Sequence, residues 1–277
     1  MATLGARNTN GAAKVRSVER ALRIMLAFSP EEPELSLSEV SRRLKLSVST
    51  THRLLRTLQA YGFVGHQEDR SEYRLGLTLF KLGSIVQHSM TLHRQADSAL
   101  RRLSRRTQET AYLCNVDNDQ ALCLDRVDGE HQVRVLALDV GGRLPLNCGG
   151  APRALLASLS DEEIHRLIRQ NRFVRLRPKS LVRPAEIWED VKRTRKQGYV
   201  FCAEDVIESV GAIGAPIRDH SGQVVGALSI AGILPHFEGE LRAAKIQAVV
   251  EEARVVSEGL GWTDSLLPHP GKDGHRP

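Results

Sequence analysis

No apolar run in the 277 residues approaches the roughly 20 residues that a transmembrane helix requires, so we expect no membrane span. The four cysteines include no Cys-x-x-Cys pair and are too sparse for a disulfide scaffold. We expect no metal site and no cofactor. The first fourteen residues lack the apolar segment of a signal peptide, which predicts a disordered arm at 1–14. These absences together indicate a cytoplasmic protein.

Acidic residues are absent from 40–67, although the same stretch carries Arg42, Arg43, Lys45, Arg53 and Arg56. Surface helices usually mix both signs of charge, so a basic stretch without acids favours a polyanionic partner. The net charge of +6 and the isoelectric point of about 9.3 agree with this interpretation. Neither the net charge nor the isoelectric point is specific for nucleic-acid binding, because membrane-surface proteins have similar values.

Residues 46–58 fit one helix with an apolar stripe that includes Leu54, Leu55 and Leu58. Its remaining surface consists of small hydroxyl side chains, a histidine and two arginines. Helices are also predicted on both sides of Pro30 and Pro33, the second beginning at a Ser-x-x-Glu capping box at 36–39. Three short helices in this order indicate a helix-turn-helix. The strand patterns that flank 67–71 predict a hairpin, which would be the wing of a winged helix.

The third predicted helix has the composition of a helix that reads DNA, because hydroxyl groups and arginines bind phosphates and base edges. A solvated helix face is the alternative, and Arg53 could instead brace the helix internally. We predict these DNA contacts: Ser38, Ser47, Ser49, Thr50, Thr51, His52, Arg53, Arg56 and, at the wing tip, Arg70. The expected partner is double-stranded DNA.

The second half of the chain alternates between strand and helix patterns. Strands are predicted at 111–116, 121–127, 131–140, 210–218 and 224–231. Helices are predicted at 92–109, 161–170, 181–198 and 238–259. The chain is therefore expected to be α+β, with a winged helix-turn-helix at 15–76, a linker helix at 77–94, an α/β domain at 95–264 and a disordered tail at 265–277.

A loop of small residues at Gly149, Gly150 and Ala151 runs into a predicted helix. The free N–H groups and the dipole of a helix N-terminus favour an anion, so this loop is a candidate binding site. Close packing of the loop against the sheet is the alternative. Ser229 is a polar residue within an apolar strand and needs a hydrogen-bond partner, which a ligand could supply. Asp205 is a weaker candidate, because a carboxylate in a loop is usually solvated.

Cys114 and Cys123 would lie opposite each other if the intervening turn is centred between Asn118 and Asp119. A redox switch is one interpretation, and two small buried hydrophobic residues are the other, which we favour because cytosolic thiols stay reduced. The basic helix around 101–106 has two interpretations as well. It could add nonspecific affinity for DNA, but a solvated face or the rim of a dimer is the expectation that we adopt.

Several motifs resemble those of the IclR family of bacterial transcriptional regulators. They are Ser-Val-Glu-Arg-Ala-Leu at 17–22, Leu-x-x-Ser-Thr-x-His-Arg-Leu-Leu-x-Thr-Leu at 46–58, Tyr-x-Leu-Gly at 73–76, Gln-Gly-Tyr at 197–199, Ala-Pro-Ile at 215–217 and Ala-Leu-Ser-Ile at 227–230. The resemblance implies a winged helix-turn-helix followed by a GAF-like α/β domain that binds a small effector, by analogy a small organic acid. It also implies dimers, or dimers of dimers, on palindromic or repeated operators.

The resemblance places the effector near the small-residue loop, Asp205, Ala212 and Ser229. The chain departs from the family pattern in this region, with Asn147 at a common histidine and Ala212 where some members carry cysteine. The resemblance therefore implies the fold but not the effector. An enzyme domain that uses Cys148 or Cys202 as a nucleophile is an alternative, although no suitably spaced base supports it and we expect no catalytic residue. A DNA-architectural protein without an effector is another.

Overall fold

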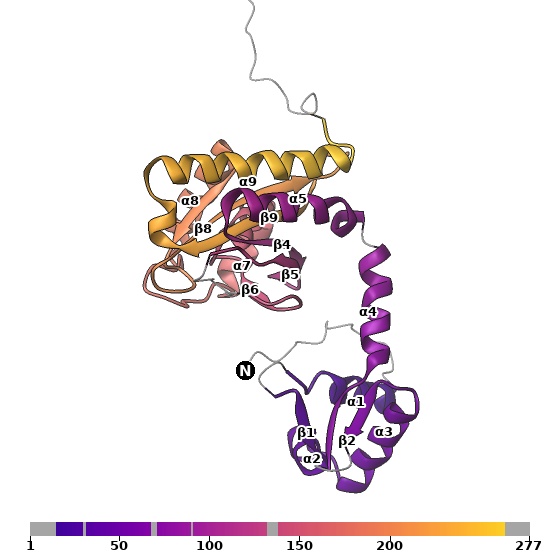
Figure 1. Ribbon diagram of the computed structural model, residues 1–277. Coiled ribbons are helices and arrows are strands. Elements are labelled where there is room, and N and C mark those ends of the chain that lie inside the picture. The colour runs from indigo at the N-terminus through magenta and orange to yellow at the C-terminus, as the bar shows by residue number, and fades with distance from the viewer. Residues whose placement is uncertain (1–14, 30–31, 68–70, 90, 132–137, 264–277) are drawn as a thin grey trace, which may run out of the picture. The chain divides into compact units, whose positions relative to one another are not determined.

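The computed structural model describes residues 15–29, 32–67, 71–89, 91–131 and 138–263 (Figure 1). The chain divides into two compact units, 1–89 and 90–277. The predicted arm at 1–14, the tail at 265–277 and most of the strand predicted at 131–140 lie outside the described residues. Every described helix is too short or too polar to span a lipid bilayer.

The N-terminal unit contains three helices, a small sheet and a fourth helix. The helices are α1 (Arg16–Met25), α2 (Leu37–Leu44), α3 (Val48–Ala60) and α4 (Leu77–Ser89). The antiparallel sheet has the order β1-β3-β2, formed by β1 (Glu34–Ser36), β3 (Glu72–Leu75) and β2 (Val64–Gln67). This is the predicted winged helix-turn-helix, with β2 and β3 as the wing.

Local sequence signals explain where the helices of this unit begin. Ser36 and Glu39 form the predicted capping box at the start of α2. Lys45 then adopts a left-handed conformation (φ 53°), which turns the chain so that Ser47 can cap α3. The first helix follows Val15 without a side-chain cap. Ile24, Leu55 and other buried apolar residues from all three helices and the wing form one core.

The C-terminal unit is built on a six-stranded antiparallel sheet with the order β6-β5-β4-β9-β8-β7. Its strands are β4 (Thr110–Asp117), β5 (Gln120–Val127), β6 (Arg143–Pro145), β7 (Val200–Ala203), β8 (Val210–Arg218) and β9 (Val224–Ile233). Its helices are α5 (Thr91–Thr107), α6 (Gly150–Ser158), α7 (Asp161–Arg169), α8 (Pro184–Gln197), η2 (Leu234–Phe237) and α9 (Gly239–Gly259). The predicted linker at 77–94 corresponds to α4 and the first residues of α5.

Side chains alternate between the two faces of this sheet, and each face has its own core. Leu113 of β4 and Ile230 of β9 pack with α5 and α9, which lie side by side in Figure 1. Tyr112 and Ala231 of the same strands face the core that includes α6 and α8. The sheet therefore separates two environments.

Candidate DNA-reading helix and effector pocket

The start of α3 carries a cluster of hydroxyl groups at the protein surface. The Ser47 side chain accepts a hydrogen bond from the Thr50 backbone N–H (3.3 Å) and donates to the Thr50 hydroxyl (2.9 Å). Ser47 and Ser49 are exposed, and Thr50 is half-buried. Ser38 is also exposed, at the start of α2. These side chains both order the helix N-terminus and remain within reach of a partner.

The predicted contact at Thr51 is wrong. Its side chain is 0% exposed, and its hydroxyl donates to the Ser47 carbonyl oxygen (3.0 Å). Thr51, Leu55 and Leu58 share the buried stripe of α3, because they are spaced at i, i+4 and i+7. The same spacing can be read from the sequence, so Thr51 could have been predicted as a core residue.

Exposed cations and a histidine continue the surface of α3. His52, Arg53 and Arg56 are exposed. Within the described residues, the Arg53 and Arg56 guanidinium groups have no hydrogen bond or ion pair, so no described partner supports a bracing role for Arg53. Arg43 differs, because it donates to Glu32 (2.5 Å) and to the Ala27 carbonyl oxygen (3.3 Å). The predicted contact at Arg70 lies outside the described residues.

The six residues predicted to contact an effector line one cavity in the C-terminal unit. They are Gly149, Gly150, Ala151, Asp205, Ala212 and Ser229. The cavity contains about 460 Å³ of space outside the protein atoms, part of it open to solvent. The other lining residues, which the sequence interpretation missed, are Tyr112, Cys114, Leu138, Leu144, Pro152, Val206, Ile207, Val210 and Ala231. The cavity therefore has mainly apolar walls with few polar groups.

Strand register could have identified two of the lining residues that were not predicted. Tyr112 of β4 pairs directly with Ser229 of β9. Paired residues lie on the same face of a sheet, and Cys114 follows two positions after Tyr112. Once β4 and β9 are placed as neighbours, Ser229 therefore predicts Tyr112 and Cys114 as further lining residues.

Glycines allow α6 to begin directly on the sheet. A Cβ atom at Gly214 of β8 would lie 2.2 Å from the Gly150 carbonyl oxygen. Gly149, the residue before α6, has a φ of +93°. Pro152 falls within the first turn of α6, where its missing N–H costs no intrahelical hydrogen bond. The sequence left two interpretations of the loop 149–151, close packing against the sheet and a binding site. They are compatible, since the loop packs on β8 and also lines the cavity.

A buried ionic network holds Asp205 beside the start of α6. Arg153 donates to Asp190 (Nε to Oδ2, 2.9 Å) and to Asp205 (Nη1 to Oδ2, 3.2 Å). Asp205 Oδ2 also accepts from the Gly149 amide (3.0 Å). Burial alone would lower the pKa of Arg153, but Cys202, Asp190 and Asp205 together raise it above its ordinary value. The carboxylate of Asp205 is therefore buried and paired, in contrast to the solvated state expected as its alternative.

Asn147, which stands at a common histidine of the resembled family, is fully buried. Its amide nitrogen donates to the Val174 and Leu181 carbonyl oxygens (2.8 and 2.7 Å), and its amide oxygen accepts from the Val174 amide (3.3 Å). Asn147 thus tethers the segment between α7 and α8 to the loop before α6, and it is not among the residues that line the cavity.

The two cysteines considered as nucleophiles are poorly suited to that role. Burial raises the pKa of the Cys148 thiol to about 11 and that of Cys202 well above its ordinary value. A thiolate is the reactive form, so both groups are unreactive near neutral pH. Cys114 and Cys123 pair across β4 and β5 as predicted, and both are buried free thiols.

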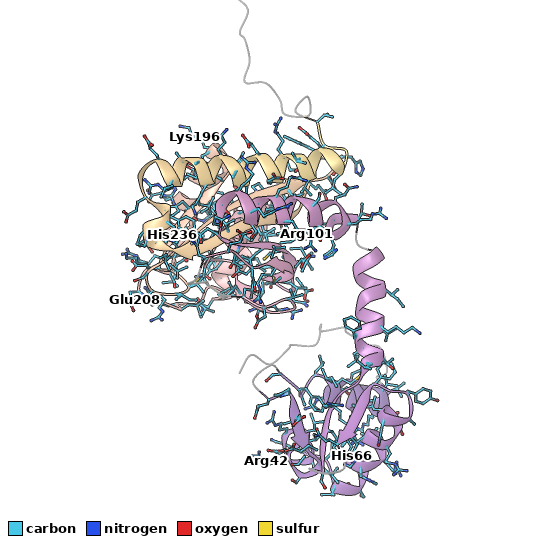
Figure 2. All side chains as sticks on the ribbon, viewed as in Figure 1. Arg42, His66, Arg101, Lys196, Glu208 and His236 are labelled. Atoms are coloured by element: carbon cyan, nitrogen blue, oxygen red, sulfur yellow. The ribbon has the colours of Figure 1, made fainter. Side chains whose placement is uncertain are left out.

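Three arginines of α5 form ion pairs within the protein. Arg102 binds Glu252 of α9 (2.8 Å), Arg106 binds Glu251 (2.8 Å), and Arg101 binds Asp97 on its own helix (3.1 Å). Arg101 lies on α5 in Figure 2. These ion pairs agree with the expected solvated face better than with a DNA-binding patch.

Comparison with known proteins connects both sites to one family. The sequence pattern of the IclR helix-turn-helix domain matches residues 17–68, and that of the bacterial transcriptional regulator IclR C-terminal domain matches 85–258. The transcriptional regulator KdgR of Dickeya chrysanthemi is 30% identical over 90% of this chain and 81% of its own length. The transcriptional repressor AllR of Escherichia coli is 30% identical over 92% of each chain.

Solved structures support the same assignment. An IclR homologue of Microbacterium hydrocarbonoxydans, crystallised with 4-hydroxybenzoate, is 26% identical and has a TM-score of 0.79, over 88% of this chain and 98% of its own. HmgR of Pseudomonas aeruginosa is 25% identical with a TM-score of 0.75, over 90% of this chain and all of its own. The chain is therefore a DNA-binding transcriptional regulator rather than an enzyme, with a C-terminal effector-binding domain, and it belongs to the IclR family.

Proposed function

We propose that this regulator reads its operator with the exposed side chains of α2 and α3 and that a small organic acid in the cavity controls this binding. The proposed DNA contacts are Ser38, Ser47, Ser49, Thr50, His52, Arg53 and Arg56. Hydroxyl groups near a helix N-terminus can reach base edges or phosphates, and an arginine can read guanine. We place its action in the cytoplasm, where a bacterial chromosome is read.

Exposed apolar side chains support a homodimer on DNA. Val18 and Leu22 of α1 are 55% and 50% exposed, and Leu26, directly after α1, is 59% exposed. Leu77 of α4 is 85% exposed. Apolar side chains spaced along a helix normally face a core or a partner. A second copy of the chain would cover them and would present a second α3, so two half-sites would be read about 34–36 Å apart or a multiple of that distance.

The observation that carries the effector proposal is that the start of α6 and the pair Tyr112–Ser229 line one cavity. The amides of Gly150 and Ala151 lie in the first turn of α6, where they have no acceptor within the helix. They suit the carboxylate of an acid, and the apolar wall suits its hydrocarbon part. The buried Arg153 offsets the charge of Asp205, so the cavity does not present an unpaired carboxylate to an anion.

A thermal-shift screen of small organic acids against the full chain tests this proposal. The panel includes 4-hydroxybenzoate, because a relative was crystallised with that acid. Binding to the folded state stabilises it by RT ln(1 + [L]/Kd), which is about 2.7 kcal/mol at a hundredfold excess over Kd. We expect at least one acid to raise the unfolding midpoint, while its uncharged amide should not. Equal stabilisation by acid and amide would contradict the role of the carboxylate.

A further inference from the structure

Glu109, His131 and His236 meet at a second site in the C-terminal unit. They come from three segments, since Glu109 precedes β4, His131 follows β5, and His236 lies in η2. One ligand atom from each residue lies within 4.8 Å of the others. His236 Nδ1 lies 2.9 Å and His131 Nε2 lies 3.5 Å from Glu109 Oε1. Figure 2 shows His236 at the edge of this unit.

This cluster lies on the opposite face of the sheet from the effector cavity. Ser229 and Ala231 of β9 line the cavity, whereas Leu228 and Ile230 pack with α5 and α9. Gly232 lies on the same face as Leu228 and Ile230, because side chains alternate between the two faces along a strand. A Cβ atom at Gly232 would lie 2.0 Å from Glu109 Oε2, so this glycine leaves the space that the carboxylate occupies.

Two imidazoles and one carboxylate are the donor set of zinc sites that keep a coordination position for water. Magnesium and calcium prefer sites built of oxygen atoms alone. The Glu109 side chain is 3% exposed, whereas His131 and His236 are 35% and 28% exposed, which gives an ion access from solvent. We propose that Glu109, His131 and His236 bind a divalent transition-metal ion of the zinc class, independently of the effector.

Lys245 of α9 determines how readily an ion enters this cluster. Its ammonium group donates to Glu109 Oε1 (2.6 Å) and to the Thr107 carbonyl oxygen (2.9 Å). It therefore neutralises and orients the buried carboxylate before metal binds. An ion that takes Glu109 Oε1 displaces the ammonium group from that oxygen and leaves it on the Thr107 carbonyl. Removal of this competing positive charge should strengthen metal binding.

Calorimetric titration of the full chain with zinc chloride tests the site, and cobalt absorption spectra report the ligand set. In other metal sites, loss of a residue that only supports a ligand lowers metal affinity by roughly 10–100-fold. Loss of a ligand itself should lower the zinc affinity by at least as much. We expect this loss for His131→Ala and His236→Ala and tighter binding for Lys245→Met. His165→Ala removes an exposed histidine of α7 and should leave zinc binding unchanged.

Circular dichroism and operator binding identify variants that fail to fold, and Glu109→Gln provides a conservative third ligand variant. All variants retain the C-terminal histidines, so any zinc bound there is common to every titration. The proposal is overturned if the wild-type chain binds no zinc, or if folded His131→Ala and His236→Ala bind it as tightly as wild type. Weaker binding by Lys245→Met would also contradict it.

Discussion

The Asp205 carboxylate accepts a hydrogen bond from the Gly149 backbone amide, with 3.0 Å between Oδ2 and the nitrogen. The protein thus places its own carboxylate beside the start of α6 and holds it there with Arg153. The proposed acidic effector would bind next to this arrangement, at the amides of Gly150 and Ala151. The network around Arg153 therefore includes Asp205, one of the residues that line the cavity.

Replacement of Arg153 should destabilise the C-terminal unit strongly. Arg153→Met leaves Asp205 buried beside an apolar side chain and leaves Asp190 with the more exposed Arg193 alone. Breaking a buried ion pair on one side costs about 3–5 kcal/mol. Urea unfolding measures this loss. Arg153→Lys should lose less, since a charge remains. Arg183→Met, which changes an exposed arginine of the same unit, serves as the control and should unfold like wild type. Similar behaviour of the two methionine variants would refute the structural role of the network.

Two substitutions in α3 separate DNA contact from packing. Arg56→Ala should weaken operator binding by about 1–3 kcal/mol if Arg56 reads a base. Thr51→Val should leave the affinity unchanged and cost about 1 kcal/mol of folding stability, because it removes only the buried hydrogen bond to Ser47. Fluorescence anisotropy on a duplex selected from a random pool measures both affinities. A weaker complex with folded Thr51→Val, or an unchanged one with Arg56→Ala, would argue against these assignments.

Alkylation of Cys148 should depend on pH according to its raised pKa. A thiol with a pKa of about 11 is almost fully protonated at neutral pH, so its reaction with iodoacetamide should be slow. The rate should rise by about tenfold per pH unit until the pH approaches this pKa. Mass spectrometry of native and urea-unfolded protein identifies the modified cysteine. Rapid labelling of native Cys148 at neutral pH would contradict this prediction and reopen the nucleophile interpretation.

The proposed dimer depends on the exposed apolar face formed by α1 and by Leu26, which follows it directly. A double variant with Leu22→Glu and Leu26→Glu introduces charges into this face and should shift the chain toward monomers in sedimentation experiments. Operator affinity should fall with it, because one monomer supplies only one copy of α3. The control with Leu22→Met keeps an apolar side chain and should remain dimeric. An unchanged oligomeric state in the glutamate variant would exclude this face as the interface.

Helix starts and turns were predictable where the signal is local. The capping box at Ser36 and the Asn118–Asp119 turn, which sets Cys114 opposite Cys123, needed only neighbouring residues. The strands β1 and β6 were missed, since each has three residues and too few positions for an alternating pattern. The four-residue strand β7 was missed for the same reason.

The candidate pocket was predictable in part, and the missing part is long-range. Gly149–Ala151 and Ser229 could be selected because small residues before a helix and a polar residue in an apolar strand are local anomalies. The partners of Arg153 are 37 and 52 residues away in sequence. No spacing rule connects such residues, so their network and the role of Asp205 in it became visible only once α6, α8 and the segment after β7 were placed.

The central claim is that the cavity controls DNA binding, and operator affinity measured with and without an acid tests it most directly. The acid is the one that stabilises the full chain most in the thermal-shift panel, and Ala212→Leu fills part of the cavity. Ala185→Leu, on the exposed start of α8, is the control. We predict that the acid changes the operator affinity of wild type and Ala185→Leu by about 5–150-fold. Ala212→Leu should bind DNA normally and no longer respond. An unchanged wild-type affinity, or an equal response in Ala212→Leu, would contradict the account.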